Sequence, residues 1–476
     1  MPHPGAGRSC ARPALMLAVL LALLGLPGCA LFRKYDMAQI HQESAARPGR
    51  NPVIVIHGFV GSKLRNGSTH ESVWGHFVNA ITRSKTDDLA LPIDRLPITD
   101  NRDDLVPYAL YEKVAGVKFY GAMLDALRTV GGYRVGDINN PAPDDTCFVY
   151  IYDWRRDNAE SAAGLGRAIL QIKARLHAPD LKFDIVAHSM GGLVALYYMK
   201  YGTEDVLSDG REHAVTWAGV RDLGRVVLVG APLRGTMAAF RLLNTGLSRS
   251  MAPAEVFSMP SIYQLLPDDG RGHIVDPLGQ PLDIDLYDAD AWVRYGWSVF
   301  GGPRAPRRDV VVAADDRGAR HDAAGGVIDV AADSGALQRK RFLVAALDRA
   351  RAFRTALDRG TGEEPPVPVH VFGSDCIPTL DRAVLKEGPA GPVTLFDDEA
   401  TPDRSARRME ALLRAPGDGT VTATSLLGLN AVASTFFICE THGLLPANRG
   451  FQDNLFYVLL HASSQSASAA RSLSGK

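Results

Sequence analysis

One serine stands in a turn of small residues, in the hexapeptide AHSMGG at residues 187–192. The apolar run FDIV precedes the turn and LVALYYMKY follows it. In the pattern G-x-S-x-G, a sharp strand-to-helix turn exposes the serine hydroxyl, and small residues let helix and strand approach closely. Ala187 replaces the first glycine and is still small. This context predicts that Ser189 is a nucleophile; the alternative is a turn that merely requires small residues.

A serine hydroxyl needs a base to take its proton and a carboxylate to orient that base. Where this turn serves catalysis, the chain order is serine, acid, histidine. PGDGTV contains Asp418 and ETHGLL contains His442, in that order. Asp375, in FGSDC directly after a strand-like run, is the rival acid. His442 is preferred to His370 and His461 because it follows the last strand-like run in a loop, where a mobile base is expected.

Acyl transfer also needs backbone N–H groups directed at the developing oxyanion. One donor is expected from Met190, directly after the nucleophile, and a second from Phe59 or Val60 in the loop HGFVGS. That loop is no phosphate-binding loop, because it lacks G-x-x-x-x-G-K-[ST]. The chain shows no H-E-x-x-H, no C-x-x-C and no Asp-rich calcium loop. We therefore expect neither a metal nor a cofactor.

Six apolar, largely β-branched or aromatic runs are typical of strands buried on both faces. They are residues 52–57, 147–152, 183–187, 225–230, 367–372 and 435–439. Helical patterns lie between or after them, at residues 119–130, 159–177, 193–201, 337–357 and 455–460. Strands that alternate with helices predict an α/β fold, with a mostly parallel central sheet flanked by helices.

Two long insertions interrupt this alternation within the predicted domain, residues 51–461. Such insertions often form lids or binding loops. We expect a lid at about 66–111 and a cap at about 233–341, with a disordered Ser/Ala-rich tail at 462–476. Aromatic side chains of the lid and cap are candidates for an acyl-chain wall or for ordinary packing. They are Trp74, Phe77, Tyr263, Trp292 and Trp297.

The N-terminus has the pattern of an export signal. Basic residues precede the short apolar run 14–26, which ends in LPGCA. We expect a signal peptide at 1–28, a lipid-modified Cys29 and an irregular tether over 29–50, as in a bacterial outer-membrane lipoprotein facing the periplasm. The alternative is an ordinary signal peptide with an incidental Cys29.

The balance of 52 basic and 53 acidic residues argues against a nucleic-acid partner. With Cys10 removed with the signal and Cys29 lipid-modified, three cysteines remain, and an odd number cannot pair completely within one chain. Cys376 and Cys439 are the better candidates for one disulfide, and three buried thiols, including Cys147, are the alternative.

Six ordered motifs, PVIVIHGFVGSKL, YDWR, AHSMGGLV, LVGAPLRGT, SMPSIYQLLP and GDGTV, resemble the lecithin:cholesterol acyltransferase family, which includes lysosomal phospholipases A and phospholipid:diacylglycerol acyltransferases. The resemblance extends over residues 52–460. It implies an α/β-hydrolase fold with lid and cap, acting on lipid acyl esters through a serine acyl-enzyme. It also favours Asp418 as the acid and Val60, with Met190, as the oxyanion donors.

The sequence departs from this family in two places. His57-Gly58 replaces the usual Pro-Gly, and no cysteine lies between residues 61 and 111 to close the lid with a disulfide. Our hypothesis is a membrane-tethered lipid acyl-ester hydrolase or O-acyltransferase. The alternatives are a carboxylesterase or lipase on other esters, and an inactive hydrolase-fold scaffold lipoprotein.

Overall fold

The computed structural model describes most of the chain between residues 37 and 461. The described ranges are 37–45, 50–75, 89–114, 117–247, 250–301, 330–360, 364–389, 391–396 and 412–461. The predicted signal peptide, Cys29, Phe77 and the tail at 462–476 lie outside these residues. Among the described residues, no helix has the length and apolar character needed to span a bilayer.

One part of the predicted tether is helical. Residues Met37–Ala45 form α2, which corrects the expectation of an irregular segment. The buried His41 of this helix contacts Phe456 of the last helix, with ring centroids 5.5 Å apart. Packing against Phe456 of the last helix therefore stabilises α2, which its polar sequence did not predict.

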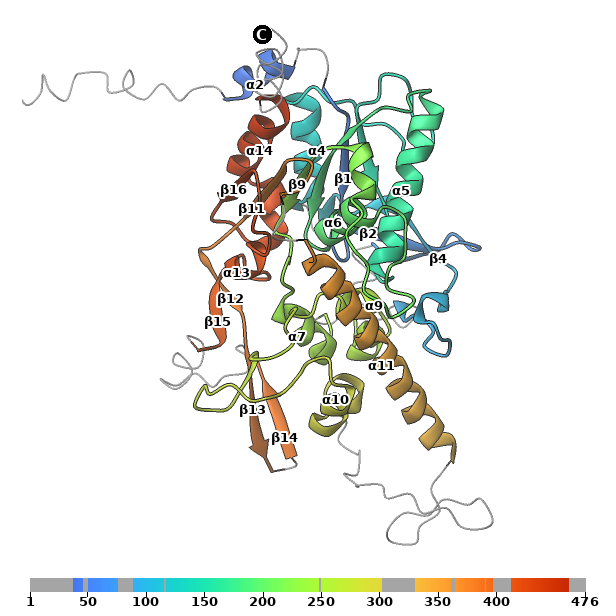
Figure 1. Cartoon of the computed structure of the whole chain (residues 1–476), viewed down its shortest axis with the longest axis vertical. Coiled ribbons are helices and arrows are strands. Elements are labelled where there is room, and N and C mark those ends of the chain that lie inside the picture. Colours follow the sequence, from blue (N-terminus) through green and yellow to red (C-terminus); the bar gives the residue numbers. More distant parts are fainter. Residues whose placement is uncertain are drawn as a thin grey trace, which may run out of the picture.

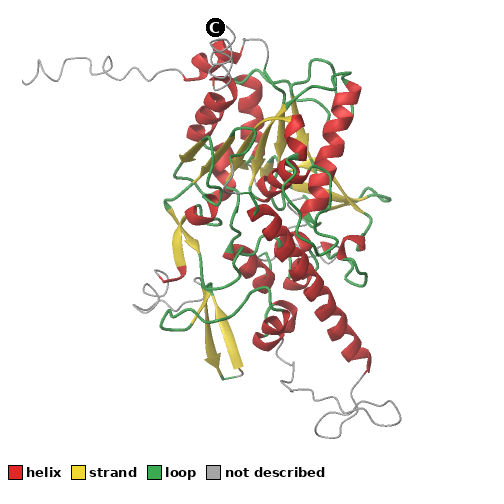
Figure 2. Ribbon diagram, in the orientation of Figure 1, coloured by secondary structure: helices red, strands yellow, loops and turns green. Residues whose placement is uncertain are grey.

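All six predicted strands form one parallel sheet, which Figure 2 shows in yellow at the centre of the upper part of the molecule. Its spatial order is β16-β11-β9-β8-β1-β7. The strands are β1 (Val53–Ile56), β7 (Cys147–Tyr150), β8 (Phe183–His188), β9 (Leu223–Val229), β11 (Val369–Gly373) and β16 (Ser434–Phe437). Every pairing in this sheet is parallel, as the α/β pattern requires.

Alternate residues of β1 belong to two different cores. Val53 and Val55 pack in the core that includes residues of α4 and α14, whereas Ile54 and Ile56 pack in the core that includes residues of α5 and α6. Both faces of the sheet are thus covered by helices, which explains the uninterrupted apolar strand sequences. The helices are α4 (Tyr120–Thr129), α5 (Asn158–Arg175), α6 (Met190–Tyr201) and α14 (Arg449–Phe456), the last continued by a π turn, η8 (Tyr457–His461).

The predicted lid at 66–111 contributes two strands to a small antiparallel sheet, with the order β3-β2-β4, whose middle strand precedes the lid. This sheet consists of β2 (Ser62–Asn66), β3 (Ser72–Trp74) and β4 (Leu105–Leu110). A short 3₁₀ turn, η3 (Ile98–Asp100), precedes β4, and the hairpin β5 (Lys113–Val114) and β6 (Val117–Lys118) follows it. Since β2 directly follows the loop HGFVG, the lid sheet begins beside the expected oxyanion loop.

The predicted cap is mostly helical, and Figure 1 shows it on the side of the sheet opposite α2 and α14. Its elements are α7 (Met237–Thr245), α8 (Pro253–Phe257), α9 (Pro260–Tyr263), β10 (Ile274–Val275), α10 (Ala289–Tyr295), η5 (Ser298–Phe300) and the start of α11 (Val330–Asp358). β10 extends a hairpin of β13 (Ala383–Gly388) and β14 (Gly391–Leu395).

The remaining elements connect the sheet to the cap and to the last helix. They are η4 (Ala218–Asp222), the antiparallel pair β12 (Ile377–Leu380) and β15 (Arg414–Gly417), α13 (Ala423–Leu426) and η7 (His442–Ala447). Ile56 of β1 pairs with Ala187 of β8, so the loops after these two strands leave the same edge of the sheet side by side. Open α/β sheets bind their ligands at this carboxyl edge.

Candidate active site

Ser189 occupies the turn between β8 and α6 in a strained backbone conformation, with φ 55° and ψ −129°. Non-glycine residues rarely adopt positive φ, and such strain is concentrated at functional sites. The crowding explains the small neighbours: a Cβ on Gly191 would lie 2.4 Å from the carbonyl oxygen of His57, and one on Gly58 would lie 2.6 Å from Cβ of Ser189. The turn therefore has the geometry of a nucleophile elbow.

Two hydrogen bonds connect Ser189, His442 and Asp418 in a line. The Oγ atom of Ser189 lies 2.8 Å from Nε2 of His442. Nδ1 of the same ring lies 2.7 Å from Oδ2 of Asp418. The backbone N–H of His442 also donates to the carbonyl oxygen of Asp418, at 2.9 Å. The three residues predicted as nucleophile, base and acid are thus brought together, and a base and a carboxylate are in hydrogen-bond range of the serine.

Asp418 is 2% exposed and follows β15 in a tight turn. Its Oδ1 atom accepts from the backbone N–H groups of Thr420 at 2.9 Å and Val421 at 2.7 Å. Burial by itself raises the pKa of Asp418, but His442 and these N–H groups outweigh it and hold the pKa below its usual range. The carboxylate is therefore ionised and oriented. The rival acid, Asp375, is exposed in the loop after β11 and makes no such contact with His442.

The loop after β1 lies beside the elbow and turns sharply at Val60, where φ is 54°. The Gly61 N–H donates to the carbonyl oxygen of Gly58 at 3.1 Å and closes the turn. Within the described part of the chain, the N–H groups of Val60 and Met190 have no hydrogen-bond acceptor. Met190 is the first residue of α6, where helix N–H groups point outward unpaired. Two donors are thus free to bind an oxyanion.

A cavity of about 530 Å³ opens beside Ser189 and His442. Its lining includes aromatic side chains from the loop after β1, the lid and the start of α4, and apolar side chains, most of which come from the cap. These residues are Phe59, Val60, Trp74, Tyr111, Phe119, Tyr120, Ala238, Ala239, Leu242, Leu247, Leu265 and Val421. The described residues that line the cavity include no Asp, Glu, Lys or Arg. An apolar site with few polar groups at one end suits an acyl chain attached to an ester.

Only one of the described aromatic candidates reaches this cavity, which is Trp74. Tyr263, Trp292 and Trp297 are fully buried in the cap and pack around Phe240 and one another. Their polar atoms have internal acceptors; for example, Trp292 Nε1 donates to the Leu286 carbonyl at 2.7 Å. These three side chains are therefore core residues rather than an acyl-chain wall. A large aromatic ring can be buried in this way when its polar atom has a hydrogen-bond partner.

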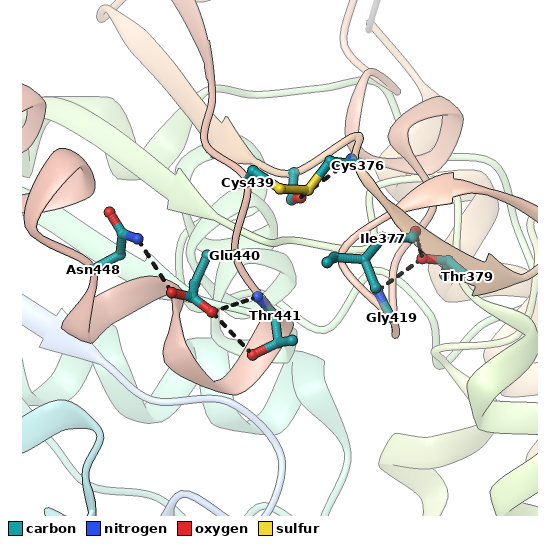
Figure 3. Close-up of a disulfide and its surroundings, with 9 residues drawn as sticks. Cys376, Ile377, Thr379, Gly419, Cys439, Glu440, Thr441 and Asn448 are labelled. Atoms are coloured by element: carbon teal, nitrogen blue, oxygen red, sulfur yellow. Dashed lines mark hydrogen bonds between the residues drawn. A yellow bond between two sulfur atoms is a disulfide. The ribbon is translucent and has the colours of Figure 1, made fainter.

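Cys376 and Cys439 form a disulfide, whose Cα atoms are 5.5 Å apart, and Cys147 is a buried free thiol. The sequence left open either one disulfide or three buried thiols, and the structure contains the disulfide. Figure 3 shows Cys439 on the segment after β16 that leads to Glu440 and Thr441, directly before His442. Cys376 lies directly before β12, which pairs with β15, the strand that leads to Asp418. The disulfide therefore joins the segment that carries the base to the strand that pairs with the segment carrying the acid.

A further contact steadies the turn that carries Asp418. The hydroxyl of Thr379 accepts from the Gly419 N–H at 2.8 Å and donates to the Ile377 carbonyl at 2.9 Å, as Figure 3 shows. Among the described residues, no group of three or more His, Cys, Asp or Glu side chains is arranged to hold a metal ion.

The parallel sheet, the elbow and the hydrogen-bonded Ser-His-Asp series define a protein of the α/β-hydrolase fold, as the sequence predicted. The family model for lecithin:cholesterol acyltransferase matches residues 106–287, a segment that contains Ser189. The family resemblance inferred from the motifs is thus confirmed. It supports an enzyme of the lipase, esterase or acyltransferase type.

Individual relatives are distant. The uncharacterized protein YJR098C of Saccharomyces cerevisiae is 24% identical over 250 residues, which are 52% of this chain and 33% of that protein. The chain therefore spans about a third of the length of this relative.

Among solved structures, the Tle4-Tli4 complex matches with 13% identity and a TM-score of 0.49, covering 87% of this chain and 98% of that one. The lipase BlEst2 of Bacillus licheniformis matches with 10% identity and a TM-score of 0.32, covering 87% of this chain and 93% of that one.

Proposed function

We propose that this protein is a serine-dependent lipid acyl-ester hydrolase or O-acyltransferase that works through an acyl-enzyme. The observation that supports the proposal most strongly is the hydrogen-bonded series Ser189–His442–Asp418 beside an apolar cavity. A serine, a base within 2.8 Å and a buried carboxylate are the groups that nucleophilic acyl transfer requires.

In the proposed reaction, Oγ of Ser189 attacks the ester carbonyl while Nε2 of His442 takes its proton. Asp418 keeps His442 in the tautomer with Nδ1 protonated and stabilises the imidazolium. The N–H groups of Val60 and Met190 bind the oxyanion. Phe59, the other candidate donor, precedes Val60 in the same loop. His442 then gives the proton to the leaving alcohol, which leaves the acyl group on Ser189. A water or an acceptor alcohol, deprotonated by His442, takes the acyl group and frees the serine.

The cavity supports a lipid ester as the substrate. Its apolar walls suit a fatty acyl chain, and its uncharged lining suits the neutral ester group. The family match supports lipids as the source of that acyl chain. A lipase or carboxylesterase acting on other esters would use the same residues, so a comparison of phospholipid vesicles with soluble short-chain esters distinguishes these functions.

For location, we propose an exported cell-envelope lipoprotein, anchored through Cys29 in the outer membrane and facing the periplasm. The disulfide Cys376–Cys439 supports export, because disulfides persist in oxidising compartments. Metabolic labelling with a radioactive fatty acid tests the anchor. Wild type should be labelled and sedimented with membranes, and a Cys29→Ser variant should be neither.

Fluorophosphonate labelling tests the serine mechanism. We expect labelling of wild type and of Ser68→Ala, an exposed control serine, and none of Ser189→Ala. If folded wild type is not labelled and cleaves no ester, the inactive-scaffold alternative is correct instead. Product analysis with a labelled phospholipid, with and without a diacylglycerol or sterol, then determines whether water or an alcohol is the acceptor.

A further inference from the structure

A second hydrogen-bonded series lies beside the candidate active site and uses none of the side chains assigned to the reaction. The N–H of Gly58 lies 2.8 Å from the hydroxyl oxygen of Tyr120. That oxygen lies 2.8 Å from Nδ1 of His188. Nε2 of His188 lies 3.0 Å from the carbonyl oxygen of His442. The series therefore runs from the oxyanion loop, through Tyr120 and His188, to the backbone of the proposed base.

The hydrogen atoms of this series have one arrangement. The carbonyl oxygen of His442 can only accept, so Nε2 of His188 carries the hydrogen, and Nδ1 of the neutral ring is an acceptor. The hydroxyl of Tyr120 must then donate to Nδ1, and its oxygen accepts from the Gly58 N–H. Every donor in the series thus has one acceptor.

The electrostatic environment keeps both side chains neutral. Burial, and then the charge of His442, lower the pKa of His188 to about 3. Burial also raises the pKa of Tyr120, so its hydroxyl keeps its proton. Neither residue is therefore suited to exchange protons with a substrate near neutral pH, although both line the cavity.

At one end, the series fixes the peptide that begins the oxyanion turn. Tyr120 holds the N–H of Gly58, while the Gly58 carbonyl accepts from Nδ1 of His57 at 2.8 Å and from the Gly61 N–H at 3.1 Å. With Gly58 held on both sides, the turn places Val60 at positive φ with a free N–H.

At the other end, the series completes the support of His442. The ring is held by Asp418 and Ser189, and the backbone N–H is held by the carbonyl oxygen of Asp418 at 2.9 Å. His188 holds the remaining backbone group, the carbonyl oxygen. A shift of His188 would therefore move the base relative to Ser189.

We propose that Tyr120 and His188 are positioning residues that fix the oxyanion loop and His442 relative to each other. This inference rests on the proposed function, because it assigns the series a role in that reaction. The two residues act through other groups: Tyr120 through Gly58, and His188 through the backbone of His442.

Steady-state kinetics on a soluble short-chain ester test the proposal. We expect Tyr120→Phe to lower kcat roughly tenfold to a hundredfold with little change in KM, because it leaves the buried Gly58 N–H without an acceptor. Tyr150→Phe is the matched control. It removes another buried hydroxyl with a 2.8 Å hydrogen bond, to the Ser161 carbonyl, away from the cavity, and should keep the wild-type kcat.

Two substitutions at His188 separate the halves of the series. Gln can keep a donor near the position of Nε2, for the His442 carbonyl, whereas Asn can keep an acceptor near the position of Nδ1, for Tyr120. Both should retain more activity than His188→Leu, which loses both bonds. Circular dichroism and a thermal melt select the variants that fold.

A double-mutant cycle decides whether Tyr120 and His188 act as one unit. We expect Tyr120→Phe combined with His188→Leu to lose little more kcat than the worse single variant. Losses in kcat that multiply, losses that appear in KM alone, or a wild-type kcat in folded Tyr120→Phe would overturn the proposal. An active wild type with any of these results refutes only the positioning role, whereas an inactive wild type refutes the proposed function itself.

Discussion

Cys376 and Cys439 are joined by a disulfide, and only Glu440 and Thr441 separate Cys439 from His442. The Glu440 carboxylate accepts from the Thr441 N–H at 2.8 Å and from Asn448 at 3.2 Å, which fixes the short segment that follows the disulfide (Figure 3). The loop of the proposed base is thus covalently bound to the strand pair that carries the proposed acid.

Removal of this disulfide should reduce both stability and activity. The bridge closes a loop of 63 residues, and native disulfides typically stabilise the folded state by about 2–4 kcal/mol. We expect Cys376→Ser combined with Cys439→Ser to lower the melting temperature and kcat, because the separation of Asp418 and His442 is then less restricted. Calorimetry and ester hydrolysis measure these effects.

The same double variant is the control for chemical reduction. Dithiothreitol should lower the melting temperature and kcat of wild type and leave those of the variant unaffected, since the remaining cysteine of the described residues, Cys147, is buried and not in a disulfide. An equal response of both proteins to the reductant would show that the disulfide does not matter for the site.

The sheet could be predicted from sequence because its inner strands are almost entirely buried on both faces and read as largely apolar runs, whereas the edge strand β16 is only partly buried. β1 and β8 are buried at every position, so their sequences carry no polar alternation that would resemble a surface strand. The first residue of a helix was harder to predict from the sequence than the strands were. α6 begins at Met190 rather than at residue 193, because the elbow turns directly into the helix without a loop.

The proposed triad was predictable because chain order and local motifs restrict it. The cavity lining was not. Tyr120 and His188 line the cavity, and their sequence signals are only a helix start and the residue beside the elbow serine. Conversely, Trp292 and Trp297 are aromatic cap residues that face the core. Which face of a short cap helix is buried depends on the packing of the whole cap, and local sequence does not encode it.

The choice of the acid can be tested by single substitutions. Asp418→Asn should lower kcat by roughly 10⁴-fold, because an amide at this position would favour the wrong tautomer of His442. Asp375→Asn should change kcat by less than about twofold, because the side chain of Asp375 is exposed at the surface and makes no contact with His442. The measurement is kcat on a soluble ester for both folded variants, and a larger loss for Asp375→Asn would assign the acid to that residue.

Stability should decrease in mild acid. Burial lowers the pKa of His57 to about 4 and that of His188 to about 3, whereas both titrate near 6.5 when unfolded. Between these values the unfolded state binds more protons, so stability rises with pH and is lost as the pH falls from 6.5. Each histidine should contribute a loss of about 3 kcal/mol by pH 4.

Urea unfolding at several pH values measures this loss. His188→Gln cannot titrate, so its stability should depend less steeply on pH between 6.5 and 4 than that of wild type. His177→Asn, at an exposed position, should keep the wild-type slope. Equal slopes for all three proteins would contradict the assignment of buried, neutral rings.

The cap helix α7 should limit the acyl-chain length. Ala238 and Leu242 of this helix line the cavity, whereas Thr245 on the same helix is exposed. Ala238→Trp should fill part of the cavity of about 530 Å³ and exclude long chains, because a closely packed site has no room for both groups. We expect kcat/KM on a long-chain ester to fall roughly tenfold or more, with a short-chain ester largely unaffected.

A series of p-nitrophenyl esters from butyrate to palmitate measures this preference, and Thr245→Trp is the control for a new indole on α7. The control should keep the wild-type chain-length profile, because Thr245 is exposed and does not line the cavity. A uniform loss over all chain lengths for Ala238→Trp would indicate damage to the catalytic groups instead. An unchanged profile would place the acyl chain against the aromatic side of the cavity, at Trp74 and Tyr111. Since residues of both the cap and the lid line this cavity, this substitution decides which of them selects the substrate.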